Sequence, residues 1–179
     1  MKAGRLSVRQ VAFYGIAGTV CIVLSAMESI LVPVVPGLPP GAKPGLSNIV
    51  IMLMAATGQT AGIFFPVLMK SVFALLTRGA SAFLMSLSGG VFSALVMMFF
   101  YRRHFRNISE TGIGILSACA HNTGQLLVSF IYTQTTALIA YYPVLLLFGT
   151  ATGLVTGIFT AVLLPRARQL AQNFFQSSE

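Results

Sequence analysis

Long apolar stretches dominate this sequence and decide the solvent in which it can fold. Of its 179 residues, 56% are hydrophobic and only 8% are charged. A water-soluble domain needs more polar surface than this composition supplies, so we expect the chain to fold in a lipid bilayer. A membrane-spanning helix needs about 20 apolar residues, which leaves room for one membrane domain of five to seven helices.

Hydrophobic runs divide the chain into six candidate spans, at about 10–34, 46–58, 60–77, 81–101, 111–132 and 140–164. The second is short, because 13 helical residues rise about 20 Å against a hydrocarbon core about 30 Å thick. It is either a re-entrant half-helix or a helix that extends into the preceding loop. We predict an all-α, polytopic membrane protein: a six-transmembrane-helix bundle over residues 1–164, followed by a cytoplasmic amphipathic or disordered tail over residues 165–179.

The distribution of positive charge predicts the orientation. With six spans and a cytoplasmic N-terminus, the outer side carries only Lys43 and Arg78, whereas five spans would place the basic residues of segment 102–106 outside, against the positive-inside rule. We therefore expect both termini to be cytoplasmic in a multi-pass protein of a prokaryotic inner membrane. The net charge of +8 is spread over short loops, which argues against a nucleic-acid partner. The cytoplasmic cations would be Lys2, Arg5, Arg9, Arg102, Arg103, Arg106, Arg166 and Arg168.

Polar residues inside the spans are the best indication of function. A charged side chain at mid-membrane costs roughly 2.5–3.5 kcal/mol on insertion scales, so pairing or hydration is favoured. Under the six-span topology these residues share one depth range in the outer half of the membrane, and we expect them to line one cavity that opens outward. They are Glu28, Lys70, His121, Asn122 and Gln125.

The spacing of these residues predicts how they meet. His121 and Gln125 are four residues apart and share a helix face, whereas Asn122 points about 100° away and can reach a neighbouring helix. Glu28 and Lys70 are expected to pair, with Glu28 neutralising Lys70 when the site is empty. The alternative is that all these groups only lock helices together.

A proline- and glycine-rich segment, residues 36–48, is expected to form a stiff external loop that leads into the second span. Ser47 or Asn48 would cap that helix, and its N-terminus beside Lys43 would offer a seat for an anion. A structural turn with Lys43 at the lipid headgroups is the alternative.

Small residues recur every fourth position in two spans, at Ala17, Cys21 and Ser25 and at Gly149, Gly153, Gly157 and Ala161. Such spacing places each set on one helix face, where small residues let helices approach closely. Intramolecular packing is the favoured interpretation, and a docking face for another membrane subunit is the alternative.

Two ordered motifs resemble a known family. Pro36-Gly37 followed by Lys43-Pro44-Gly45-Leu46-Ser47-Asn48-Ile49, and then His121-Asn122-Thr123-Gly124-Gln125-Leu126, resemble the Gx transporter family, which is labelled heptaprenyl diphosphate synthase component I. That family is similar to the substrate-binding S components of energy-coupling factor transporters. The resemblance implies a six-helix fold that binds a small molecule from outside, with Lys43, Asn48, His121, Asn122 and Gln125 at its motif positions.

The sequence departs from the family pattern at three places. Ser47 stands where alanine is expected, and Lys70 where arginine is usual. The AxxxA motif by which S components dock on their transmembrane partner is replaced in the first span by Ala17, Cys21 and Ser25.

The residues do not support an enzyme acting alone. Prenyl diphosphate condensation of the familiar kind needs aspartate-rich motifs to hold magnesium, but this chain has three acidic residues, Glu28, Glu110 and Glu179, and no aspartate. We predict neither a metal site nor a cofactor, and the two cysteines lie too far apart in sequence to indicate a disulfide or zinc site.

Two functions remain as hypotheses. The first is an S-component-like membrane protein that captures a small anionic or polar ligand through Glu28, Lys43, Asn48, Lys70, His121, Asn122 and Gln125, and energy-coupling factor subunits would be its partners. The second is a non-catalytic membrane subunit of an isoprenoid, quinone or flavin-linked redox assembly, which would dock through the glycine face of the last span and the basic loop around residues 102–106.

Overall fold

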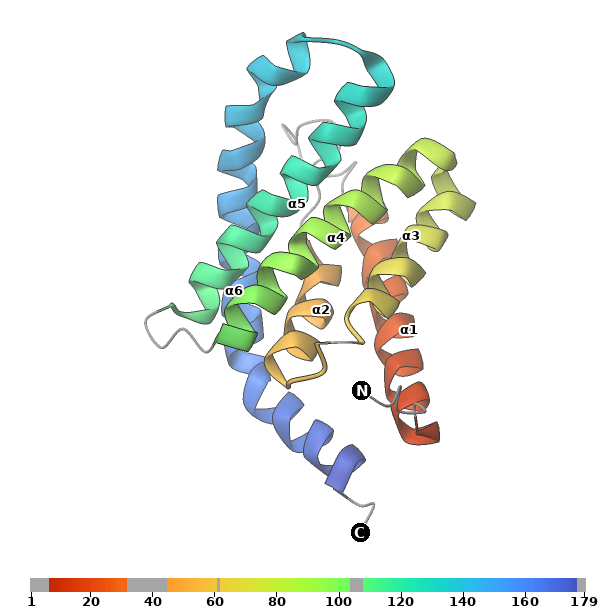
Figure 1. Ribbon diagram of the computed structural model, residues 1–179, viewed down its shortest axis with the longest axis vertical. Helices are drawn as coiled ribbons and strands as arrows, with labels where there is room; N and C mark the ends of the chain where they lie inside the picture. The colour runs from red at the N-terminus through yellow and green to blue at the C-terminus, as the bar shows by residue number, and fades with distance from the viewer. Residues whose placement is uncertain (1–6, 32–44, 61, 104–107, 177–179) are drawn as a thin grey trace.

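A computed structural model describes residues 7–31, 45–60, 62–103 and 108–176, and this part of the chain is all-helical (Figure 1). The helices run in alternating directions along the long axis of the molecule (Figure 1). α1 begins and α6 ends at one end, here called the terminal end, while the α3–α4 and α5–α6 connections lie toward the opposite end. The helices are α1 (Val8–Leu31), α2 (Leu46–Ala56), α3 (Phe64–Arg78), α4 (Ala80–Arg103), α5 (Glu110–Thr133) and α6 (Ala137–Gln176).

Among the described residues, three helices are long and apolar enough to cross a bilayer, over Val8–Ile30, Ala80–Arg103 and Ala137–Phe175. The prediction of an all-α membrane protein is confirmed to this extent: the described part is all-helical and contains helices that can span a bilayer. α5 has the same length as α4, 24 residues, but it carries His121, Asn122 and Gln125 near its centre and is not one of these three helices. Six complete crossings and cytoplasmic termini stay predictions.

α2 has 11 residues and lies inside the bundle. It follows Gly45, whose φ of 78° is a left-handed conformation that glycine adopts at little cost, and a second such glycine, Gly58 with φ of 84°, follows its end. A helix enclosed by protein does not have to match the hydrocarbon thickness, which explains its short length. The buried residues of α2 are Ser47, Asn48, Ile49, Ile51, Met52, Met54 and Ala55.

The glycines of α6 face α5. A Cβ on Gly153 would lie 2.5 Å from the Cα of Ile115, and one on Gly157 would lie 2.5 Å from the Cα of Thr111. These backbones therefore touch, and the packing interpretation of this stripe is correct. The alternative of a free docking face is wrong at Gly149, Gly153 and Gly157, because α5 covers all three, whereas Ala161 at the end of the stripe is exposed. Ala17, Cys21 and Ser25 are likewise buried in the bundle.

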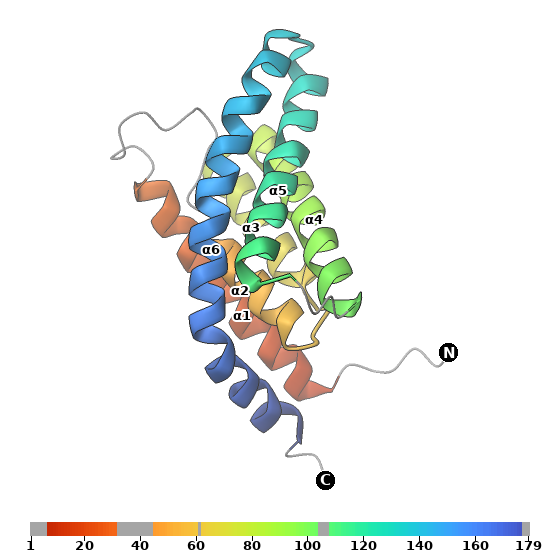
Figure 2. The same cartoon turned by 90° about the vertical axis from the view of Figure 1, so that its left-hand side faces the viewer.

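α6 continues well past the predicted end of the last span. It includes Pro165 and runs to Gln176, and its last part bends beneath the bundle (Figure 2). There the rings of Phe174 and Phe175 contact Phe13 of α1, with centroids 5.7 and 5.4 Å apart. The predicted tail from residue 165 thus begins as a continuation of α6 and packs back on the start of α1.

Candidate ligand-binding site

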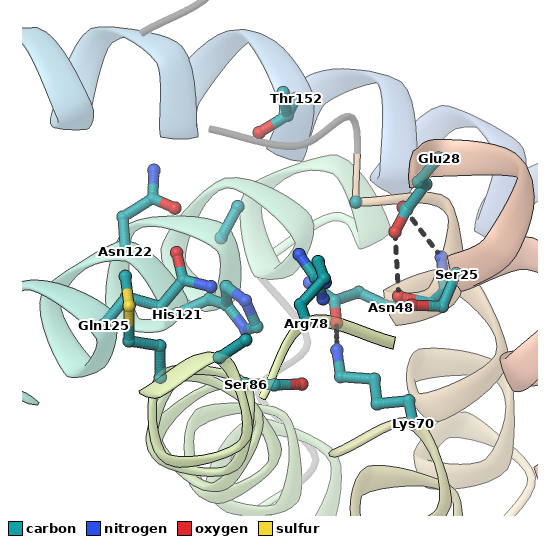
Figure 3. Close-up of a pocket in the computed structure, with 15 residues that line it drawn as sticks. Ser25, Glu28, Asn48, Lys70, Arg78, Ser86, His121, Asn122, Gln125 and Thr152 are labelled. Atoms are coloured by element: carbon teal, nitrogen blue, oxygen red, sulfur yellow. Dashed lines mark hydrogen bonds between the residues drawn. The ribbon is translucent and has the colours of Figure 1, made fainter. Parts of the chain in front are cut away.

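A polar cavity of about 200 Å³ lies where α1 to α6 converge in the half of the bundle away from the terminal end (Figure 3). Six of the seven residues proposed as ligand-binding from the sequence line it. The seventh, Lys43, lies outside the described residues. The wall consists of Ser25, Glu28, Gly45, Ser47, Asn48, Lys70, Arg78, Ala82, Met85, Ser86, Ala118, His121, Asn122, Gln125 and Thr152.

The first turn of α2 forms one wall of the cavity, and neighbouring helices hold it in place through hydrogen bonds. The carboxylate of Glu28 accepts hydrogen bonds from the backbone N–H of Ser47 at 3.1 Å and from its hydroxyl at 3.4 Å. The N-cap residue, Gly45, has no side chain to do this, so the predicted cap by Ser47 or Asn48 is wrong and Glu28 supplies it. The anion seat expected at this helix end is thus occupied by the protein's own carboxylate.

Lys70 reaches the same turn from α3. Its Nζ donates a hydrogen bond to Oδ1 of Asn48 at 2.8 Å, and both residues are 4% exposed. The expected direct pair between Glu28 and Lys70 is wrong: within the described residues the carboxylate bonds to Ser47 and the ammonium to Asn48 (Figure 3). The physical reason is that the start of α2 lies between the two charges and offers each of them a polar partner.

α5 supplies the opposite wall. His121 and Gln125 both lie against Gly89 of α4, as their shared face predicts, since a Cβ there would come within 3.0 Å of either side chain. Asn122 reaches the neighbouring helix, also as predicted, and its Nδ2 donates to the carbonyl oxygen of Leu145 in α6 at 2.8 Å. Asn122 therefore ties α5 to α6 at the cavity edge.

Several wall residues were not predicted from the sequence, and Arg78 matters most among them. It ends α3, lies exposed at the rim and brings a second cation to the cavity that contains Lys70. The charge distribution of the sequence assigns Arg78 only to the outer side of the membrane. The signal that could have placed it in the site is its position about two turns beyond Lys70 on the same helix. Ser86 and Thr152 add hydroxyl groups.

The charge balance favours an anion. Lys70 and Arg78 oppose one carboxylate, Glu28, which is already stabilised by the partial positive charge of the α2 N-terminus. Within the described ranges, no group of three or more His, Cys, Asp or Glu residues is arranged to hold a metal ion. The cavity therefore offers cations, an imidazole and amides rather than a metal centre.

The family model for heptaprenyl diphosphate synthase component I matches residues 17–163. The chain belongs to this family. The heptaprenyl diphosphate synthase component I match begins within α1, ends within α6 and includes every wall residue of the cavity. Comparisons with curated proteins and with solved structures found no match. The resemblance to this family is confirmed, whereas its similarity to S components stays a prediction.

Proposed function

We propose that this protein captures a small anionic ligand in the polar cavity, from the side of the membrane opposite its termini, as an S-component-like substrate-binding protein. One observation carries the proposal: Lys70 and Arg78, for which the described residues show no salt bridge to Glu28, share a cavity with an imidazole and amide groups inside an otherwise apolar bundle. Residues far apart in sequence, on α2, α3 and α5, contribute these groups.

The buried ammonium of Lys70 is the central element of this proposal. An ammonium has three N–H donors, and Asn48 accepts one of them. Burying a charge that is incompletely compensated is costly, so an anion entering the cavity would gain both charge attraction and hydrogen bonds. Arg78 at the rim would attract the same anion and close over it, while His121 and Gln125 would hydrogen-bond to it.

Glu28 has a different part in this arrangement. Because it caps α2, it fixes the turn that presents Asn48 to Lys70. We therefore assign Glu28 to shaping the site and Lys70, Arg78, His121 and Gln125 to contacting the ligand. Asn122, which bonds to Leu145, would hold α5 and α6 in register beside it.

The family name favours a second candidate, a non-catalytic membrane component of a polyprenyl diphosphate synthase. A cavity of about 330 Å³ at the terminal end, lined by Gln59, Arg168 and Gln172 among others, would offer such a partner a docking surface. Chemical cross-linking in native membranes distinguishes the two candidates. Recovery of an ATPase pair with a membrane coupling subunit supports transport, and recovery of a soluble prenyl synthase subunit supports the second candidate.

Direct binding tests the anion site. Purified protein in nanodiscs of zwitterionic lipid is titrated with inorganic phosphate and with acetate, and unfolding is followed by the reaction of the buried thiol of Cys21 on heating. We expect at least one anion to stabilise the wild type and neither to stabilise Lys70→Met. Arg166→Met, which removes a cation on the part of α6 beyond the cavity, is the matched control and should behave as wild type. Equal responses of wild type and Lys70→Met would overturn the proposal.

A further inference from the structure

A second cavity of about 290 Å³ adjoins the polar cavity and shares two wall residues with it, Met85 and Gln125. It lies between α4, α5 and the first turns of α6. Its remaining wall consists of Leu126, Ser129, Leu138, Tyr141 and Leu145. The shared residues Met85 and Gln125 place the two hollows side by side, and a ligand that passes between these side chains would occupy both.

The two cavities differ in chemistry. Three leucines and a methionine dominate the second, and two of its polar groups are engaged elsewhere: the hydroxyl of Ser129 donates to the carbonyl of Gln125 at 3.0 Å, and the carbonyl of Leu145 accepts from Asn122. Gln125 and Tyr141 add polar atoms at its wall, but the surface left for a ligand is mainly apolar. Met85 at the junction has a flexible, unbranched side chain that adapts to what passes beside it.

We propose that the ligand is a single-chain amphiphile, with an anionic head held by Lys70 and Arg78 and an apolar chain that passes Met85 and Gln125 into the leucine-lined cavity. This inference rests on the proposed function, because it takes the anion site as given and adds the substrate class. One chain is assigned because the leucine-lined cavity, of about 290 Å³, adjoins the polar cavity at the wall formed by Met85 and Gln125. A bilayer phospholipid would bring two chains.

The experiment compares anions that share a head but differ in their chain. Inorganic phosphate, butyl phosphate and octyl phosphate are titrated against protein in zwitterionic nanodiscs, and empty nanodiscs measure how much of each probe partitions into lipid. Each buried CH₂ strengthens binding about three- to fourfold, so four more predict an affinity for octyl phosphate on the order of 100-fold above that for butyl phosphate.

Ser129→Phe tests the path of the chain. Ser129 belongs to the wall of the apolar cavity alone, so a phenyl ring there fills that cavity and leaves the phosphate site intact. We expect the variant to bind inorganic phosphate as wild type does and to lose the gain from chain length. Ser129→Ala, which removes the same hydroxyl without filling the cavity, should keep that gain. Thermal unfolding verifies that both variants fold.

Distinct results separate this inference from the function on which it rests. Failure of all three probes to show dependence on Lys70 overturns the anion site itself. Phosphate binding that needs Lys70 but gains nothing from an alkyl chain, or a gain that survives in Ser129→Phe, overturns the amphiphile assignment alone. Displacement of octyl phosphate by phosphatidylglycerol in the nanodisc also overturns it, because the pair of cavities would then hold a membrane lipid.

Discussion

The carboxylate of Glu28 in α1 caps α2 by accepting the backbone N–H of Ser47 at 3.1 Å. The first N–H groups of a helix have no partner within the helix and carry partial positive charge, so a carboxylate is well suited to this position. Glu28 is 2% exposed, and its hydrogen bonds come from Ser47 at the start of α2 rather than from the ammonium of Lys70. A short helix between glycines thereby gains a fixed starting point.

Replacing Glu28 tests the cap. Glu28→Ala should lower the free energy of unfolding by about 1–3 kcal/mol, because it leaves a buried N–H without an acceptor. Glu28→Gln keeps a carbonyl oxygen for Ser47 and should cost less. The measurement is an SDS titration followed by far-UV circular dichroism. If the amide variant were as unstable as the alanine variant, the negative charge and not the cap would be what matters.

The bond between Lys70 and Asn48 predicts energetic coupling. Asn48→Ala should destabilise the protein, because it removes an acceptor from a buried ammonium. In a Lys70→Met background the same change should cost less, and residues in direct contact typically couple by about 0.5–3 kcal/mol. A double-mutant cycle of unfolding free energies provides the number. Strict additivity would mean that the bond contributes nothing to stability.

Much of the site was predictable, because polar residues are rare in this chain. Sequence periodicity predicted that His121 and Gln125 share one helix face and that Asn122 reaches a neighbouring helix. Both features are found. The rarity of charged residues inside the spans was enough to predict that Glu28 and Lys70 line the same cavity. Their partners were not predictable, because charge complementarity suggests a direct pair, whereas the actual bonds depend on where the first turn of α2 lies in three dimensions.

The fold was predictable to a similar depth. Apolar runs located the six helices of the described ranges, and the short second run predicted a helix shorter than a membrane span. The continuation of α6 through Pro165 was missed because proline in sequence usually signals the end or a kink of a helix. Here the contacts of Phe174 and Phe175 with Phe13 stabilise the longer helix. They could not be predicted because they join residues that are distant in sequence.

The direction in which the cavity opens is tested by thiol labelling. Cys21 and Cys119 are replaced by serine, and a single cysteine is introduced at Ser86 in the cavity wall or at Gln172 near the terminal end. A membrane-impermeant maleimide applied to right-side-out spheroplasts should label Ser86→Cys and not Gln172→Cys, and inverted vesicles should show the reverse. Ser117→Cys, at a position 1% exposed, is the control that should react from neither side. The opposite pattern would place the cavity on the cytoplasmic side.

The close contact of α5 and α6 predicts a sharp difference between two glycines. A Cβ on Gly153 would lie 2.5 Å from the Cα of Ile115 and 2.6 Å from the carbonyl oxygen of Gly114, both backbone atoms that cannot move aside separately. Gly153→Ala should therefore force the helices apart and cost about 1–3 kcal/mol.

The matched control for this variant is Gly15→Ala in α1, where an added Cβ meets nothing within 4 Å. It should leave stability unchanged or raise it by up to about 1 kcal/mol, since alanine favours a helix more than glycine does. Because α5 carries His121 and Gln125, separating it from α6 should also weaken anion binding in Gly153→Ala and leave Gly15→Ala unaffected. Calorimetric titration with phosphate, beside the unfolding curves, measures both effects. Wild-type stability in Gly153→Ala would show that the two helices are not in backbone contact in the membrane.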